Sequence, residues 1–457
     1  MKKKPIIALD VTIIVHGEFG GITNVTKKAH EALHNDSRFQ TINAFFDHTS
    51  QKYYAIEDAY TLNFTHKQSL PNLHFFVRIL DMLLYVFSDK FSKKKAVRSY
   101  TYAQLMERGL WKPLMKIFHF IVGHGKNSNA IAAEKASRNV VLKKYVKCLD
   151  AKPLDFSKID GFFHSGIPLT EFSIIAKQKA KHGFKFGVMI YDIIPIRNAS
   201  VCGAGFVRYF QQYLPQVLKF ADFIVTDSKF VKQDLTNYIN EVGAKFPAER
   251  ITPVQLATDS TPNIDTKKTV EILEKYNIKT GKYAIIVCTV EPRKNHRLLL
   301  DVWSKIAAEN AESLIPLVVV GGKGWMTEEI QEEMASLNYI TRPPFVQDEE
   351  KTVLLKNARF SLFPSIAEGW GMPITESLEV GTPVISSDNS SMPEAGQGVS
   401  EMINCEDFDK WHATTLKYIQ NDEVIANKRT EISQAKLRTW GDFSKELCDV
   451  IANEMQI

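Results

Sequence analysis

Short apolar segments rich in valine, isoleucine and phenylalanine recur along the chain, and each is followed by a longer segment with helical spacing of its apolar residues. This alternation predicts parallel βα units with helices on both sheet faces, and therefore a doubly wound α/β fold. The predicted strands are Ile6–Leu9, Gly161–His164, Phe186–Ile190, Phe223–Thr226, Ala284–Cys288, Pro316–Val320, Phe360–Phe363 and Pro383–Ser386.

The polar stretch Thr258–Thr269 interrupts this rhythm, because it contains a proline and has no apolar periodicity. It is predicted to join two α/β domains. The length of 457 residues agrees, since one hydrophobic core stops growing well below that size. We expect a first domain over residues 1–262, a second over 270–435 and a terminal helix over 436–457.

A second interruption lies at Leu73–Lys126, where apolar helical segments alternate with basic clusters. One interpretation is a helical insertion that lies on an acidic membrane surface or grips a lipid-borne acceptor. The other is a pair of amphipathic helices that cover the first sheet, with their lysines in solvent. The sequence leaves both open.

Composition excludes several classes of protein. Apolar residues make up 44% and charged residues 24%, as in ordinary globular chains. Five scattered cysteines without a CxxC pair argue against a disulfide framework or a zinc site, and favour a reducing compartment. The apolar start is interrupted by Asp10, so we expect a buried strand there and neither a signal peptide nor a spanning helix. The net charge of +5 suits anionic ligands but does not indicate nucleic acid.

A glycine-rich loop in the second half is the strongest candidate for a ligand site. Proline is favoured at the first position of a helix, so a helix is predicted to begin near Pro373, with the N–H groups of Gly371, Met372 and Ile374 free to bind an anion. Glu368 and Glu376 flank this turn. Each carboxylate can accept hydrogen bonds from vicinal hydroxyls, or it can serve only the helix dipole or solvent.

Arg293 and Lys294 follow the predicted strand Ala284–Cys288. A turn after a parallel strand lies at the carboxyl edge of the sheet, where ligands of such folds bind. Two adjacent cations there would complement a diphosphate. Adjacent arginine and lysine residues are common on protein surfaces. The pair indicates an anion site only in combination with the predicted helix start near Pro373.

In the first half, Gly20 and Gly21 would permit close approach of the backbone to a phosphate, or they form an ordinary turn. Asp192 follows an apolar strand and could reach a reacting sugar, or it caps a turn. No GxGxxG motif with a downstream acidic residue and no GxxxxGK[ST] motif is present, which disfavours nicotinamide and P-loop sites. Asp407 and Asp409 form a DxD, in which we interpret Asp409 as a helix N-cap.

Taken together, the segments EGWGMPITE, EPRKN, GGKGW, FVQDEE and PEAG resemble glycosyltransferase family 4, and the resemblance covers about Gly281–Gly398. It implies the GT-B fold, with two Rossmann-like domains facing a cleft and a last helix, from Trp440, that returns to the first domain. It also implies a retaining transfer of a hexose from a nucleotide sugar, with no metal ion or other cofactor.

The resemblance assigns roles to particular residues. Glu368 would bind the transferred sugar as a catalytic residue together with Asp192, and Glu376 would bind the ribose. Lys294 and Arg293 would neutralise the diphosphate at the helix start formed by Gly371, Met372 and Pro373. The base would meet the backbone of Val346, and Gly20 and Gly21 would close on the phosphates.

Two departures from the family bear on the donor. Tyr191-Asp192 stands where many relatives have His-Asp, and YDIIPI is similar to a form seen in mannosyltransferase-like members, which favours GDP-mannose. Cys288 stands where relatives often have arginine, so Arg293 and Lys294 would bear more of the diphosphate charge. The expected acceptor is a glycan or lipid-linked glycan of bacterial surface polysaccharide. The expected location is the cytoplasm, with peripheral association at the inner membrane face. A silent nucleotide-binding protein and a sugar-nucleotide epimerase remain alternatives.

Overall fold

A computed structural model describes residues 4–15, 21–47, 50–56, 151–166, 172–257, 265–343 and 346–456 of the chain. The segment 73–126, Gly20 and most of the predicted junction lie outside these residues. The internal contacts divide the chain into two units. The larger unit comprises Met1–Pro5, Phe19–Gln40 and Asp160–Ile457, and the smaller unit comprises Ile6–Glu18 and Thr41–Ile159.

The smaller unit holds strands in the order β4-β3-β2-β1. The pairs β2–β3 and β3–β4 are antiparallel, a feature that the sequence did not predict. Inside this unit the Tyr53 hydroxyl donates to Asp10 Oδ2 at 2.9 Å. Its elements are β1 (Ile6–Asp10), α1 (Thr12–Val15), β2 (Gln40–Asp47), β3 (Lys52–Ile56), β4 (Lys152–Pro153) and the 3-10 turn η1 (Phe156–Lys158).

The larger unit begins with four parallel strands in the order β5-β6-β7-β8. Every residue of β5 and β7 is buried, in agreement with the apolar residues Phe162–Phe163 and Phe223–Val225 that they contain. The strands are β5 (Gly161–His164), β6 (Lys185–Ile190), β7 (Phe223–Thr226) and β8 (Ile251–Pro253). Their helices are α2 (Gly21–Asn35), α8 (Phe172–His182), α9 (Ile194–Arg197), α10 (Ala204–Phe220) and α11 (Lys229–Glu241), with 3-10 turns η2 (Ala199–Val201) and η3 (Ala248–Arg250).

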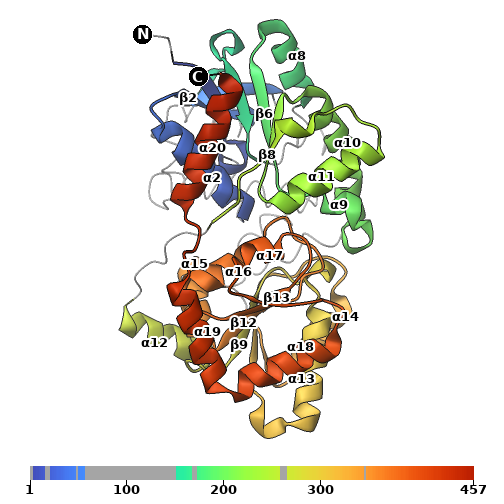
Figure 1. Ribbon diagram of the computed structural model, residues 1–457, viewed down its shortest axis with the longest axis vertical. Helices are drawn as coiled ribbons and strands as arrows, with labels where there is room; N and C mark the ends of the chain where they lie inside the picture. Colours follow the sequence, from blue (N-terminus) through green and yellow to red (C-terminus); the bar gives the residue numbers. More distant parts are fainter. Residues whose placement is uncertain are drawn as a thin grey trace, which may run out of the picture. The chain divides into compact units, whose positions relative to one another are not determined.

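The second sheet of this unit has six parallel strands in the order β11-β10-β9-β12-β13-β14. Figure 1 labels β9, β12 and β13 of this sheet. The order reverses between β9 and β12, and ligands of doubly wound sheets bind at the carboxyl ends of strands at such a point. The strands are β9 (Ala284–Val287), β10 (Leu317–Val320), β11 (Ile340–Thr341), β12 (Phe360–Phe363), β13 (Val384–Ser387) and β14 (Glu401–Ile403).

Helices cover both faces of the six-stranded sheet, as the sequence predicted. Alternate residues of β9 point to opposite faces: Ala284 and Ile286 pack with α13, α14 and α18, whereas Ile285 packs with α12 and α15. The helices are α12 (Thr266–Lys275), α13 (His296–Glu309), α14 (Glu328–Ser336), α15 (Asp348–Asn357), α16 (Met372–Glu379), α17 (Met392–Ala395), α18 (Phe408–Gln420) and α19 (Asp422–Gln434), with 3-10 turns η4 (Pro292–Lys294) and η5 (Ala311–Ser313).

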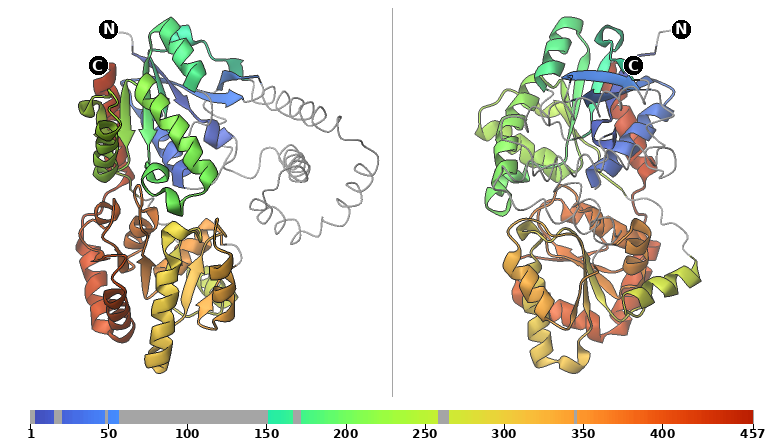
Figure 2. Two further views of the ribbon diagram at one scale, coloured as in Figure 1. Left: turned by 90° about the vertical axis from the view of Figure 1, so that its right-hand side faces the viewer. Right: turned by 180° about the vertical axis from the view of Figure 1, so that it is seen from behind.

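The terminal helix α20 (Trp440–Met455) returns to α2 of the first sheet, which confirms the expectation for the end of the chain (Figures 1 and 2). The Cys448 thiol donates to the Ala32 carbonyl at 3.4 Å, and Arg38 pairs with Asp449 at 2.9 Å. With its two α/β sheets, each containing a run of parallel strands, and this returning helix, the chain has the GT-B fold.

Two local predictions were wrong for reasons of helix capping. The expected junction extended to Thr269, but α12 begins at Thr266 because the Asp265 carboxylate accepts the N–H groups of Lys267 and Lys268. Asp409 is not an N-cap. Asp407 caps α18 by accepting the Lys410 N–H at 3.0 Å, which leaves Asp409 inside the first turn.

Candidate active site

The loop after β9 places the two predicted cations at the carboxyl edge of the second sheet. Cys288 N donates to Val320 O and Val290 N to Gly322 O, so the pairing of β9 with β10 continues beyond the strand ends. The turn η4 then carries Arg293 and Lys294 and ends at Asn295, which adopts the left-handed conformation with φ of 54°.

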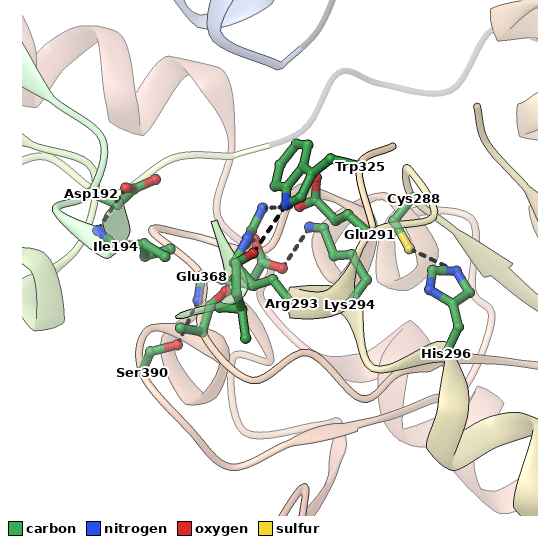
Figure 3. A network of polar contacts seen from close by, with 12 residues as sticks. Asp192, Ile194, Cys288, Glu291, Arg293, Lys294, His296, Trp325, Glu368 and Ser390 are labelled. Atoms are coloured by element: carbon green, nitrogen blue, oxygen red, sulfur yellow. Dashed lines mark hydrogen bonds and ion pairs between the residues drawn. The ribbon is translucent and has the colours of Figure 1, made fainter. Parts of the chain in front are cut away.

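Both cations meet Glu368 in a buried ion-pair cluster (Figure 3). Lys294 Nζ lies 2.6 Å from Glu368 Oε1, and Arg293 Nη1 lies 2.7 Å from Glu368 Oε2. Arg293 Nη2 pairs in addition with Glu291 Oε1 at 2.8 Å. Glu368 and Lys294 are only 7% and 8% exposed, so these charges interact with little screening by water.

The electrostatics of this cluster keep Glu368 ionised. Burial alone would raise the pKa of Glu368, but the charges and hydrogen bonds of Lys294 and Arg293 outweigh it and lower the pKa to about 2. For Arg293, burial acts against the charged form, yet Glu368 and Glu291 raise its pKa. The cluster therefore holds two carboxylates and two cations.

Backbone contacts fix Glu368 in place. Its N–H donates to Ser390 Oγ at 2.9 Å, and the Ser391 hydroxyl donates to its carbonyl at 2.9 Å. Arg293 Nη1 also donates to the Ala367 carbonyl at 2.6 Å. The loop after β12 is thus tied to the loop after β9 and to the residues after β13.

The predicted helix start is present and begins one residue earlier than Pro373. Helix α16 runs from Met372 to Glu379, and its N-cap Gly371 has φ of 107°, a conformation that favours glycine. Ile374 N donates to Gly371 O at 2.9 Å. The expectation of a free Ile374 N–H was therefore wrong, because the first turn closes on Gly371.

Glu376 lies on α16 and pairs with Lys351 of α15 at 2.8 Å. Its side chain is 23% exposed, so it is more accessible than Glu368. The side chain of Val346, which precedes α15, packs against the core cluster that includes Ile285 and Leu354. The predicted contact of Val346 with a base stays a prediction.

Asp192 follows β6, and its Oδ1 accepts the Ile194 N–H at 3.0 Å at the start of α9. This contact is the turn-capping role considered for it. Burial raises the pKa of Asp192, while the charge of Arg293 opposes that rise and Glu368 adds to it. The charges of Arg293 and Glu368 therefore act on Asp192, which Figure 3 draws together with the cluster.

Of the two predicted glycines, Gly21 is described and opens α2. A Cβ built on Gly21 would lie 3.9 Å from Met372 Cγ, so Gly21 faces the N-terminus of α16. Gly20 lies outside the described residues. The structure thus brings Gly21 and Met372 together from distant parts of the sequence.

Two members of the site were missed by the sequence analysis. Glu291 is buried and shares Arg293 with Glu368. Trp325 donates from Nε1 to the Val201 carbonyl at 3.2 Å and lies beside the cluster in Figure 3. Both belong to segments that the resemblance used, EPRKN and GGKGW, so their position in those motifs was the available signal.

The described residues contain neither a metal-binding cluster nor a membrane-spanning helix. No group of three or more histidine, cysteine, aspartate or glutamate side chains is arranged to hold a metal ion in that part of the chain. No helix among the described residues has both the length and the apolar character needed to cross a membrane.

The part of the chain that forms the second sheet is similar to a known sequence family. Residues 269–433 match the family model described as glycosyl transferases group 1. O-antigen chain mannosyltransferase B of Escherichia coli is 31% identical over 241 residues, which are 51% of this chain and 61% of that protein. The serotype-specific mannosyltransferase WbdA of Escherichia coli is 25% identical over 219 residues, 46% of this chain and 26% of that protein. The chain spans less than two thirds of either relative.

Among solved structures, the crystal structure of HepE from Anabaena in complex with UDP-glucose has the same fold. The TM-score is 0.52 at 12% sequence identity, with 68% of this chain and 82% of that chain covered. An identity this low shows the fold and not the substrate.

Proposed function

We propose that the chain is a retaining glycosyltransferase that moves mannose from GDP-mannose to a glycan or lipid-linked glycan in bacterial surface polysaccharide synthesis. The observation that carries the proposal is the buried cluster in which Glu368 holds Arg293 and Lys294 at the carboxyl edge of the second sheet. Paired cations at this edge suit a diphosphate. The mannosyltransferase names of the two Escherichia coli relatives support mannose as the sugar.

The cluster explains how the cations can be ready before the donor binds. Glu368 is the counter-ion that allows Arg293 and Lys294 to be buried, because buried charges are stable only when paired. On binding, the diphosphate oxygens take over part of that role at the start of α16, and Glu368 accepts hydrogen bonds from the sugar hydroxyls. Glu376 would bind the ribose from its more exposed position on α16.

Retention follows from a reaction on one face of the sugar. The acceptor oxygen forms its bond to the anomeric carbon while the bond from that carbon to the phosphate oxygen breaks, and the departing phosphate takes the acceptor proton. Arg293 and Lys294 stabilise the charge that develops on the nucleotide, so we propose that no metal ion is required. We propose that Asp192, which follows β6, binds a hydroxyl group of the reacting sugar through its carboxyl.

The cellular location is also a proposal. The four described cysteines, Cys202, Cys288, Cys405 and Cys448, are free thiols. Free thiols suit a reducing compartment, so we propose a cytoplasmic protein that associates peripherally with the inner face of the membrane.

A screen of sugar nucleotides tests the proposal. The protein is incubated with GDP-mannose, UDP-glucose or UDP-N-acetylglucosamine, with and without EDTA, and nucleotide release and the anomeric configuration of the product are measured by NMR. We expect GDP-mannose to be consumed equally in EDTA, with the α configuration kept. Binding without turnover would instead favour a silent binding protein, and a changed sugar without acceptor would favour an epimerase.

Variants test the assigned residues. Lys294→Ala, Glu368→Ala and Glu376→Ala should each lose most of the transfer activity. Lys268→Ala is the matched control, because Lys268 forms an exposed ion pair with Glu349 between α12 and α15. Full turnover in Lys294→Ala would contradict the role given to Lys294.

A further inference from the structure

Arg342 lies at the same sheet edge as the ion-pair cluster and was not singled out by the sequence. It follows β11 directly, and β11 pairs in parallel with β10. Its Nη2 donates to the carbonyl of Gly321, the first residue after β10, at 3.3 Å, and its Nη1 donates to Gln331. Arg342 is therefore held at the carboxyl ends of the strands, next to the loop that continues the β9–β10 pairing.

Arg342 differs from the neighbouring cations in the charge of its hydrogen-bond partners. The other described cations at this edge are each paired with a carboxylate: Arg293 and Lys294 with Glu368, Lys323 with Glu328 and Lys351 with Glu376. Both acceptors of Arg342 are neutral, and none of the ion pairs among the described residues includes it. Its Nε is buried without a hydrogen-bond partner.

An unpaired, partly buried guanidinium has a free-energy cost, because desolvation is not offset by a counter-ion. Burial accordingly lowers the pKa of Arg342. A cation kept in such a position is stabilised most by an anionic ligand that supplies the missing charge.

The positive charge of Arg342 acts near the loop after β9 that carries Arg293 and Lys294. His296 directly follows that loop, and its Nε2 lies 3.7 Å from Cys288 Sγ (Figure 3). Burial is the main cause that lowers the pKa of His296 to about 3, and the charges of Lys294 and Arg342 lower it further. Lys294 and Arg342 thus act on the same imidazole.

We propose that Arg342 is a further donor-binding residue, whose uncompensated positive charge attracts the diphosphate of the nucleotide sugar. The inference rests on the proposed function. Two cations and two carboxylates in the cluster of Arg293, Lys294, Glu368 and Glu291 sum to zero net charge. Arg342 adds a positive charge beside this neutral cluster before an anionic donor arrives.

The chain supplies a matched control in Arg429 of α19. It is likewise partly buried, and its guanidinium donates to the carbonyls of Ala358 at 2.8 Å and Gly381 at 3.3 Å. These carbonyls precede β12 and β13, so Arg429 lies at the amino edge of the sheet. Both guanidinium groups donate to neutral oxygen atoms, and the two arginines differ in the edge of the sheet at which they lie.

The test is calorimetric titration of the full chain with GDP, UDP and inorganic pyrophosphate at two salt concentrations. For Arg342→Gln we expect about tenfold or more weaker binding of all three anions and a smaller loss of affinity with added salt. Arg342→Lys keeps the charge and should recover much of the affinity. Arg429→Gln should bind like the wild type.

Three results would overturn the inference. Unchanged affinities in a folded Arg342→Gln variant would make Arg342 a structural residue. Weaker GDP binding with unchanged UDP and pyrophosphate binding would make it a base contact. A wild type that binds none of the three anions would also remove the proposed function, whereas the first two results leave that function intact.

Discussion

Lys294 and Glu368 are 74 positions apart in the chain, and their charged groups meet at 2.6 Å inside the protein. Lys294 comes from the loop after β9 and Glu368 from the loop after β12, and these strands are neighbours at the point where the strand order reverses. Because parallel strands end at one edge, the sheet itself brings the two loops together. The pair can therefore form only when the second sheet is assembled.

Removal of Glu368 should destabilise the fold strongly. Glu368→Ala leaves Arg293 and Lys294 buried without their shared counter-ion, and breaking a buried pair in this way costs about 3–5 kcal/mol of unfolding free energy. Glu376→Ala removes the partly exposed pair with Lys351 and should cost ~1 kcal/mol or less. Urea unfolding measures both variants, and equal losses would contradict the difference in burial.

The ionisation of Glu368 should appear in the pH dependence of stability. Its pKa falls from an ordinary 4.5 to about 2 on folding, so the stabilisation is complete above pH 4.5 and is lost as the pH falls toward 2. The wild type should lose stability over this interval more steeply than Glu368→Gln, which cannot titrate there. The difference between the two urea midpoints, followed with pH, isolates this group from other carboxyls.

His296 should destabilise the protein in a higher pH range. Burial, followed by the charges of Lys294 and Arg342, lowers its pKa from 6.5 to about 3. Between these two pKa values His296 is protonated in the unfolded chain and neutral in the folded chain. The free energy of unfolding therefore falls as the pH falls below 6.5. A His296→Gln variant should show a shallower fall between pH 6.5 and pH 4.5, and equal slopes would contradict the assignment.

Many of the parallel strands could be predicted because they are buried on both faces. Phe360–Phe363 and Phe223–Thr226 were found with the observed bounds, since a continuous apolar run is what such a strand requires. The antiparallel β2 and β3 were missed. Their sequences QTINAFFD and KYYAI mix exposed and buried positions without the helical segment that marks a parallel unit.

The sequence singled out individual residues of the candidate site but did not predict the ion pairs between them. Motif order located Glu368, Arg293 and Lys294, but the sequence assigned the cations to a ligand and the carboxylate to a sugar. Their mutual ion pairs depend on β9 lying beside β12, which is a tertiary property. The ion pair of Glu291 with Arg293 and the lack of an ion-pair partner for Arg342 among the described residues could not be predicted for the same reason. Both depend on which residues are neighbours in the folded structure.

Gly321 should be required for the loop between β10 and α14 to lie against β9. Its φ is 151°, which side-chain-bearing residues rarely adopt, and an added Cβ would lie 1.9 Å from the Cys288 carbonyl oxygen. Gly321→Ala should therefore cost about 1–3 kcal/mol of stability and displace the carbonyl that Arg342 contacts. The adjacent Gly322 is the matched control, since a Cβ there meets nothing within 4 Å and its φ is ordinary. Gly322→Ala should change stability by about 0.5 kcal/mol or less. Urea unfolding of both variants decides the matter, because equal effects would show that the close approach of Gly321 to Cys288 is not what constrains this loop.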